Sequence, residues 1–129
     1  MGIKLVIVDD APFMREVIRH LLEGEKIEVV GEAKDGQEAV EVILRHKPDV
    51  VLMDIVLPIK TGLQATREIL KKCPETRVIA CSTESHEDMV LKALEAGCES
   101  FIAKPFKKEE LVNAILNLNP SSEKERKNE

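Results

Sequence analysis

Three aspartates stand directly after apolar runs of this sequence, at the points where buried strands would end. Asp9 and Asp10 follow residues 5–8, and Asp54 follows residues 50–53. If these runs are neighbouring parallel strands, the three carboxylates crowd one edge of the sheet, and their repulsion favours a bound cation. Hard oxygen ligands with room for water suit Mg²⁺, with Mn²⁺ as the alternative. The competing interpretation makes Asp9 and Asp10 a helix-capping turn and Asp54 a turn former.

Hydroxyl and lysine side chains follow the last two apolar runs. Ser82 and Thr83 come after the fourth run, and Lys104 comes after the fifth, followed by Pro105. A lysine at the same sheet edge as the acids supplies a positive charge for a bound phosphoryl oxygen, and a hydroxyl can donate a further hydrogen bond. Taken alone, Lys104 would be a solvated surface residue before a turn proline. Its predicted position opposite the acids favours the role in phosphoryl binding.

Five short apolar runs alternate with five stretches of helical periodicity. This β-α-β-α order is typical of α/β proteins with a parallel sheet covered by helices on both faces. Central parallel strands read as unbroken aliphatic residues, as residues 5–8 and 50–53 do, whereas Glu28 and Glu32 mark the second run as an edge strand. The five predicted strands are residues 5–8, 27–30, 50–53, 78–81 and 101–103.

The residues between the runs repeat apolar side chains at helical spacing. The first stripe predicts a helix from Pro12, which suits a first turn, to about Glu23. We expect Gly97 to end the fourth helix, and Gly62 and Pro74 to bound the third. The other four helices are predicted around residues 39–44, 63–70, 89–94 and 111–118.

The composition indicates one packed domain followed by a polar end. Of the 129 residues, 43% are apolar and 33% are charged, which suits a globular domain at residues 1–119. Residues 120–129 are expected to be a disordered, charged tail. The net charge of -5 argues against direct nucleic acid binding, and no apolar run approaches the ~20 residues of a membrane span. Three widely spaced cysteines fit reduced thiols in the cytoplasm.

Short motifs follow one another in an order that is specific to a known family. They are Val-Asp-Asp at 8–10, Met-Asp-Ile-Val-Leu-Pro at 53–58, Gly62, Ala-Cys-Ser-Thr at 80–83, Ala-Gly at 96–97 and Lys-Pro-Phe at 104–106. From residue 3 to about residue 118, the chain resembles the CheY-like receiver domain of bacterial and archaeal response regulators. The resemblance implies a flavodoxin-like (βα)5 three-layer sandwich with a parallel sheet of order 2-1-3-4-5. It also implies a signalling protein that catalyses only its own phosphorylation and dephosphorylation, and no other enzyme activity.

By this resemblance, Asp54 accepts a phosphoryl group from a sensor histidine kinase or a phosphotransfer protein. Asp10, Asp54 and the backbone carbonyl of Val56 would contact Mg²⁺, while Asp9 would act through metal-bound water. Phosphoryl transfer has a loose transition state, so the site needs placement and charge neutralisation more than strong bases. Mg²⁺ and Lys104 would supply that neutralisation.

The resemblance also implies a switch. The family's usual spacing selects Ser82 as the switch hydroxyl and Phe101 as the switch aromatic. The two states would differ on the face made by the fourth helix, the fifth strand and the fifth helix, where a downstream effector binds. Thr83 stands where the family usually has a very small residue, so the choice between Ser82 and Thr83 as the switch hydroxyl stays open. The bond from Lys104 to Pro105 is expected to be cis, which aims the lysine amine at the acids.

Two side chains near Asp54 bear on hydrolysis of the phosphoryl group. Val56 cannot orient a water molecule, whereas Glu84 can. Val56 also argues against a phosphatase with an aspartyl-phosphate intermediate, because such enzymes need a second aspartate at that position. A flavodoxin-type cofactor binder shares the sheet order, but Asp9 and Asp10 would repel its phosphate.

Three possibilities remain open within the family. The chain is expected to be a free regulator of chemotaxis type, a phosphorelay intermediate, or the N-terminal receiver of a longer regulator. Only the polar tail follows the fifth helix, which favours the free regulator. We expect a cytoplasmic monomer or a weak, phosphorylation-dependent dimer, with no direct contact to nucleic acid or membrane.

Overall fold

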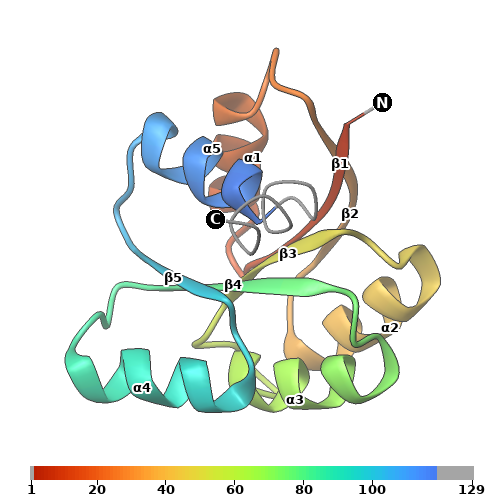
Figure 1. Cartoon of the computed structure of the whole chain (residues 1–129), viewed down its shortest axis with the longest axis vertical. Helices are drawn as coiled ribbons and strands as arrows, with labels where there is room; N and C mark the ends of the chain where they lie inside the picture. Colours follow the sequence, from red (N-terminus) through yellow and green to blue (C-terminus); the bar gives the residue numbers. More distant parts are fainter. Residues whose placement is uncertain (1, 119–129) are drawn as a thin grey trace, which may run out of the picture.

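The computed structural model describes residues 2–118, and the predicted tail at 120–129 lies outside this part of the chain. Within the described residues, five strands form one parallel sheet of order β2-β1-β3-β4-β5, which confirms the predicted order (Figure 1). The strands are β1 (Ile3–Val8), β2 (Ile27–Ala33), β3 (Val50–Asp54), β4 (Arg77–Ser82) and β5 (Ser100–Ala103).

The helices alternate with the strands and cover both faces of the sheet. Figure 1 shows α1 and α5 together on one side, with α2, α3 and α4 on the other. The helices are α1 (Pro12–Leu21), α2 (Gly36–His46), α3 (Gly62–Lys72), α4 (Glu87–Ala96) and α5 (Lys108–Asn117). The fold is therefore the predicted flavodoxin-like three-layer sandwich. None of the described helices is both long and apolar enough to cross a membrane.

Two apolar cores lie on opposite faces of the sheet. Because side chains alternate along a strand, Leu5 and Ile7 pack toward Ile18 of α1 and Leu111 of α5. Their neighbours Val6 and Val8 pack in the second core. Its helical members come from the other three helices: Ala39, Val40, Val42 and Ile43 of α2, Ala65 and Ile69 of α3, and Ala93 of α4. Fully burying one such aliphatic side chain contributes roughly 1.5–3 kcal/mol. The two cores bury β1 and β3 on both faces, and neither strand is at the edge of the sheet.

The edge strand β2 is longer than its apolar run. The sequence predicts a strand over 27–30, but pairing with β1 continues to Ala33, which lies opposite Val8. The register shifts between Leu5 and Val6, where Val30 is skipped, and the ladder continues with Gly31 and Glu32 beyond the apolar run. The extension brings the end of β2 beside the end of β1.

Local signals end the helices close to the expected positions. Gly97 caps α4 with a φ of 108°, as predicted, because this left-handed conformation is easiest for glycine. Helix α3 begins at Gly62, behind a capping box formed by Thr61 and Gln64. Helix α1 ends at Leu21 rather than about residue 23, because the chain turns after it through Gly24, with a φ of 81°.

Candidate functional site

The three aspartates predicted to converge do so at the carboxyl edge of the sheet. Asp9 and Asp10 follow β1, and Asp54 ends the neighbouring strand β3. One carboxylate oxygen from each lies within 4.8 Å of the other two. Asp9 and Asp54 are only 3% and 7% exposed, whereas Asp10 faces solvent. The cluster is therefore partly dry and open on one side.

Lys104 reaches this cluster from the end of β5. Its Nζ donates to Oδ2 of Asp9 at 2.7 Å and to Oδ2 of Asp54 at 3.2 Å. The peptide bond between Lys104 and Pro105 is cis, in agreement with the expectation from the family resemblance. One ammonium is thus shared by two buried carboxylates.

Burial and the charge of the oppositely charged partner shift the pKa values of Asp54 and Lys104 in opposite directions. Burial raises the pKa of Asp54, the charge of Lys104 lowers it, and the charge of Asp9 raises it again, so that its pKa lies above the ordinary value. Burial alone would lower the pKa of Lys104, but its hydrogen bond to Asp9 and the charge of Asp54 raise it overall. Lys104 therefore stays protonated at neutral pH. When Asp9, Asp10 and Asp54 are ionised, three negative charges face one positive charge, so the donor set suits a divalent cation.

The loop after β3 packs tightly against the strand that carries Asp54. The backbone N–H of Val56 donates to Oδ1 of Asp54 at 3.1 Å, and the Val56 side chain is exposed. A Cβ added to Gly62 would lie 2.2 Å from the carbonyl oxygen of Asp54, so a side chain there would push the two segments apart. Gly62 therefore permits the close approach that fixes Asp54.

The end of β4 separates the two candidate hydroxyls. Ser82 is buried, and its Oγ accepts a hydrogen bond from the backbone N–H of Glu84 at 3.0 Å. Thr83 is exposed, as is the Glu84 side chain. Phe101 is half-buried on β5, where it pairs with Ala80 and packs against the core on the α2, α3 and α4 side.

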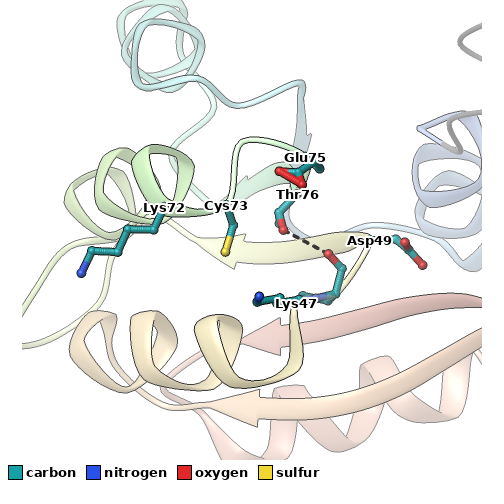
Figure 2. Close-up of a pocket in the computed structure, with 7 residues that line it drawn as sticks. Lys47, Asp49, Lys72, Cys73, Glu75 and Thr76 are labelled. Atoms are coloured by element: carbon teal, nitrogen blue, oxygen red, sulfur yellow. Dashed lines mark hydrogen bonds between the residues drawn. The ribbon is translucent and has the colours of Figure 1, made fainter.

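A pocket lies at the opposite edge of the sheet. Its volume is about 170 Å³, and Figure 2 shows the side chains of Lys47, Lys72 and Cys73 around it. Thr76 closes one side by donating to the carbonyl of Pro48 at 3.1 Å. The pocket lies before β3, whereas Asp54 ends that strand, so it is separate from the acidic cluster.

The environment of the three cysteines does not favour reactive thiolates. All three are buried free thiols. Burial raises the pKa of Cys81 to about 12 and that of Cys98 to about 11. Both thiols are therefore protonated at neutral pH, and the thiolate is the reactive form of cysteine.

The structure places one further residue against the acidic cluster that the sequence analysis did not identify. Arg15 of α1 donates from Nη1 to the carbonyl oxygen of Asp9 at 2.5 Å. In the sequence, Arg15 is an ordinary charged residue between the apolar positions of a helix. Its contact depends on how α1 packs beside the extended β2, and no local pattern encodes that arrangement.

Comparison with known proteins gives one consistent family. The model of the response regulator receiver domain matches residues 5–116. The chain is 43% identical to the chemotaxis protein CheY of Thermotoga maritima, over 89% of this chain and 96% of that protein. It is 41% identical to the CheY of Halobacterium salinarum, over 92% and 98%. Among solved structures, the CheX-CheY-BeF3-Mg+2 complex of Borrelia burgdorferi is similar with a TM-score of 0.85, at 27% identity, over 90% of this chain and 88% of that one.

Proposed function

Because this chain belongs to the response regulator receiver domain family, we propose that it accepts one phosphoryl group on Asp54 in a Mg²⁺-dependent reaction. The donor is a phosphohistidine on a sensor histidine kinase or a phosphotransfer protein. The observation that carries the proposal is the convergence of three aspartates and Lys104 at one sheet edge.

The side chains of the cluster fit a hard divalent cation. Asp10, Asp54 and the backbone carbonyl of Val56 would hold Mg²⁺, with Asp9 acting through water, and Mn²⁺ would fit the same oxygen donors. The similar Borrelia structure is a complex that contains BeF3 and Mg²⁺. When bound, the ion supplies positive charge to the oxygens of the incoming phosphoryl group.

Asp54 acts as the nucleophile. One of its carboxylate oxygens bonds to phosphorus while the bond from phosphorus to the histidine nitrogen breaks, so the electron pair of that bond stays with the imidazole. Lys104 already lies between Asp9 and Asp54, where its ammonium can hold a phosphoryl oxygen. The loose transition state makes this placement of charge the main contribution of the protein.

Ser82 is the better candidate for the switch hydroxyl. It is buried at the end of β4 beside Asp54, whereas Thr83 is exposed. On phosphorylation the Ser82 hydroxyl turns to donate to the phosphoryl group, and Phe101 moves into the space that it leaves. The α4-β5-α5 face then changes and binds a downstream effector.

The similar CheY proteins favour a role in chemotaxis. We propose a cytoplasmic location for this protein. A phosphorelay intermediate and the N-terminal receiver of a longer regulator are the alternatives, and the protein acts as a monomer or a weak, phosphorylation-dependent dimer. A phosphatase is disfavoured because Val56 occupies the position where such an enzyme needs a second aspartate.

Transfer from candidate histidine kinases tests the proposal. Each kinase is labelled with radioactive phosphate and mixed with this protein, with and without Mg²⁺. The label should move to the wild type and to Asp49→Asn, which alters an exposed aspartate at the other end of β3, but not to Asp54→Asn. Equal labelling of Asp54→Asn, or steady turnover of a phosphate ester, would refute the proposal.

A further inference from the structure

Asp9 is held by hydrogen bonds at both its peptide groups and its carboxylate. Its N–H donates to the carbonyl of Ala33 in β2 at 3.0 Å, and Nη1 of Arg15 donates to its carbonyl at 2.5 Å. Its carboxylate accepts from the N–H of Ala11 at 2.9 Å and from Nζ of Lys104 at 2.7 Å. The residue is therefore fixed by β2, α1 and β5 together.

Asp10 has no comparable support for its own side chain. It faces solvent, and its carboxylate has no hydrogen bond or ion pair with the other residues of the described chain. Its direction therefore depends on its backbone, and the peptide group that precedes it contains the carbonyl of Asp9. Arg15 donates a hydrogen bond to that carbonyl. It therefore restrains the orientation of the peptide group from which the Asp10 side chain projects.

Arg15 is itself anchored on β2. Its Nε donates to Oε1 of Glu32 at 2.7 Å, and Arg19 bonds the other oxygen of the same carboxylate. Burial would raise the pKa of Glu32, but the hydrogen bonds from Arg19 and Arg15 lower it overall, so the carboxylate is charged at neutral pH. The side chain of Arg15 is 17% exposed and that of Arg19 is 43% exposed. Both arginines share one partner, but the hydrogen bond to Asp9 comes from Arg15.

We propose that Arg15 is a positioning residue for the acidic cluster, because its guanidinium bridges Glu32 and the Asp9 carbonyl and so holds Asp10 toward Asp54. The planar guanidinium offers donors in two fixed directions, which a lysine ammonium does not reproduce. This inference rests on the proposed Mg²⁺-dependent function. Its consequence is that Arg15 sets metal affinity without contacting the metal.

Metal affinity in paired variants provides the test. Mg²⁺ binding to the unphosphorylated protein is measured by isothermal titration calorimetry for the wild type, Arg15→Met and Arg19→Met, and thermal unfolding is measured on the same samples. Loss of a group that orients metal ligands typically weakens affinity about 10- to 100-fold, and we expect a loss in this range for Arg15→Met. Arg19→Met removes a contact to Glu32 but none to Asp9, and should stay within about twofold of the wild type if the Arg15 bridge remains.

Two further variants separate charge from geometry and allow for misfolding. Arg15→Lys keeps the positive charge but lacks the two fixed donor directions of the guanidinium. Wild-type Mg²⁺ affinity in this variant would therefore overturn the proposal. Glu32→Gln leaves Arg15 in place but weakens its anchor, and should lower affinity in the same direction even if Arg15→Met does not fold. Wild-type affinity in a folded Arg15→Met protein would refute the inference alone. Absence of Mg²⁺ binding to the wild type would refute the proposed function as well.

Discussion

The Val56 side chain gives the first prediction at the scale of single residues. It is exposed beside Asp54 and offers no hydrogen bond to a water molecule that attacks the phosphoryl group. Val56→Asn should therefore speed loss of the phosphoryl group. If the new side chain contributes one hydrogen bond of about 1 kcal/mol in the transition state, the rate rises about fivefold.

The measurement is the release of phosphate over time from purified phosphorylated protein at equal Mg²⁺. Val56→Ala serves as the control for lost bulk, because it adds no hydrogen-bonding group. An unchanged or longer lifetime in Val56→Asn would show that Glu84 or Thr83 governs access of water instead.

Ile59 gives a second prediction at the same scale. Its φ is 69°, a left-handed conformation that is costly for a β-branched residue, and its side chain is 82% exposed. Asparagine tolerates this conformation much better, so Ile59→Asn should stabilise the fold by about 1 kcal/mol. Urea unfolding measures the effect, with Val56→Asn as an exposed control in the same loop. A lower midpoint for Ile59→Asn would mean that Ile59 makes a contact that offsets its backbone strain.

At the scale of elements, Glu32 joins β2 to α1 through two arginines. Its pKa in the folded protein lies below the ordinary value of 4.5. A carboxylate with a depressed pKa contributes stability that is complete above its unfolded pKa and is lost as the pH falls through the folded pKa. At pH 7, Glu32→Gln should therefore lower the free energy of unfolding by about 1–2 kcal/mol.

Urea unfolding of both proteins from pH 7 down to below pH 4.5 checks this result. The difference between wild type and Glu32→Gln should shrink as the pH falls below that value. Glu28→Gln, which changes an exposed residue of the same strand, should show little difference at any pH. A constant difference for Glu32→Gln would show that its charge is not what joins the two elements.

The elements also show how far the sequence could be interpreted. Unbroken aliphatic runs predicted β1 and β3 as central strands, and the aspartates after them predicted the acidic cluster. These signals are informative because a strand that is buried on both faces is a run of consecutive aliphatic residues, which can be recognised in the sequence. The sheet order came from the family resemblance. The extension of β2 to Ala33 and the bridge from Arg15 were not predicted. The first involves a register shift between β1 and β2, and the second depends on packing between elements.

At the scale of the whole molecule, the parallel sheet gathers residues that are distant in the chain. Asp9 and Lys104 are 95 positions apart and are joined by one hydrogen bond. The two cores hold the strand ends in place, while the charged groups remain at an open edge that a protein donor can reach. The arrangement suits a module that receives a group from a partner.

The most direct test of this account is intact-mass spectrometry after incubation with acetyl phosphate. Wild type and Asp49→Asn should gain the mass of one phosphoryl group when Mg²⁺ is present and none when it is chelated. Asp54→Asn should gain none under either condition, although it remains folded. Addition of the same mass to Asp54→Asn, or addition to the wild type without a divalent cation, would contradict the assignment of Asp54 as the phosphoryl acceptor.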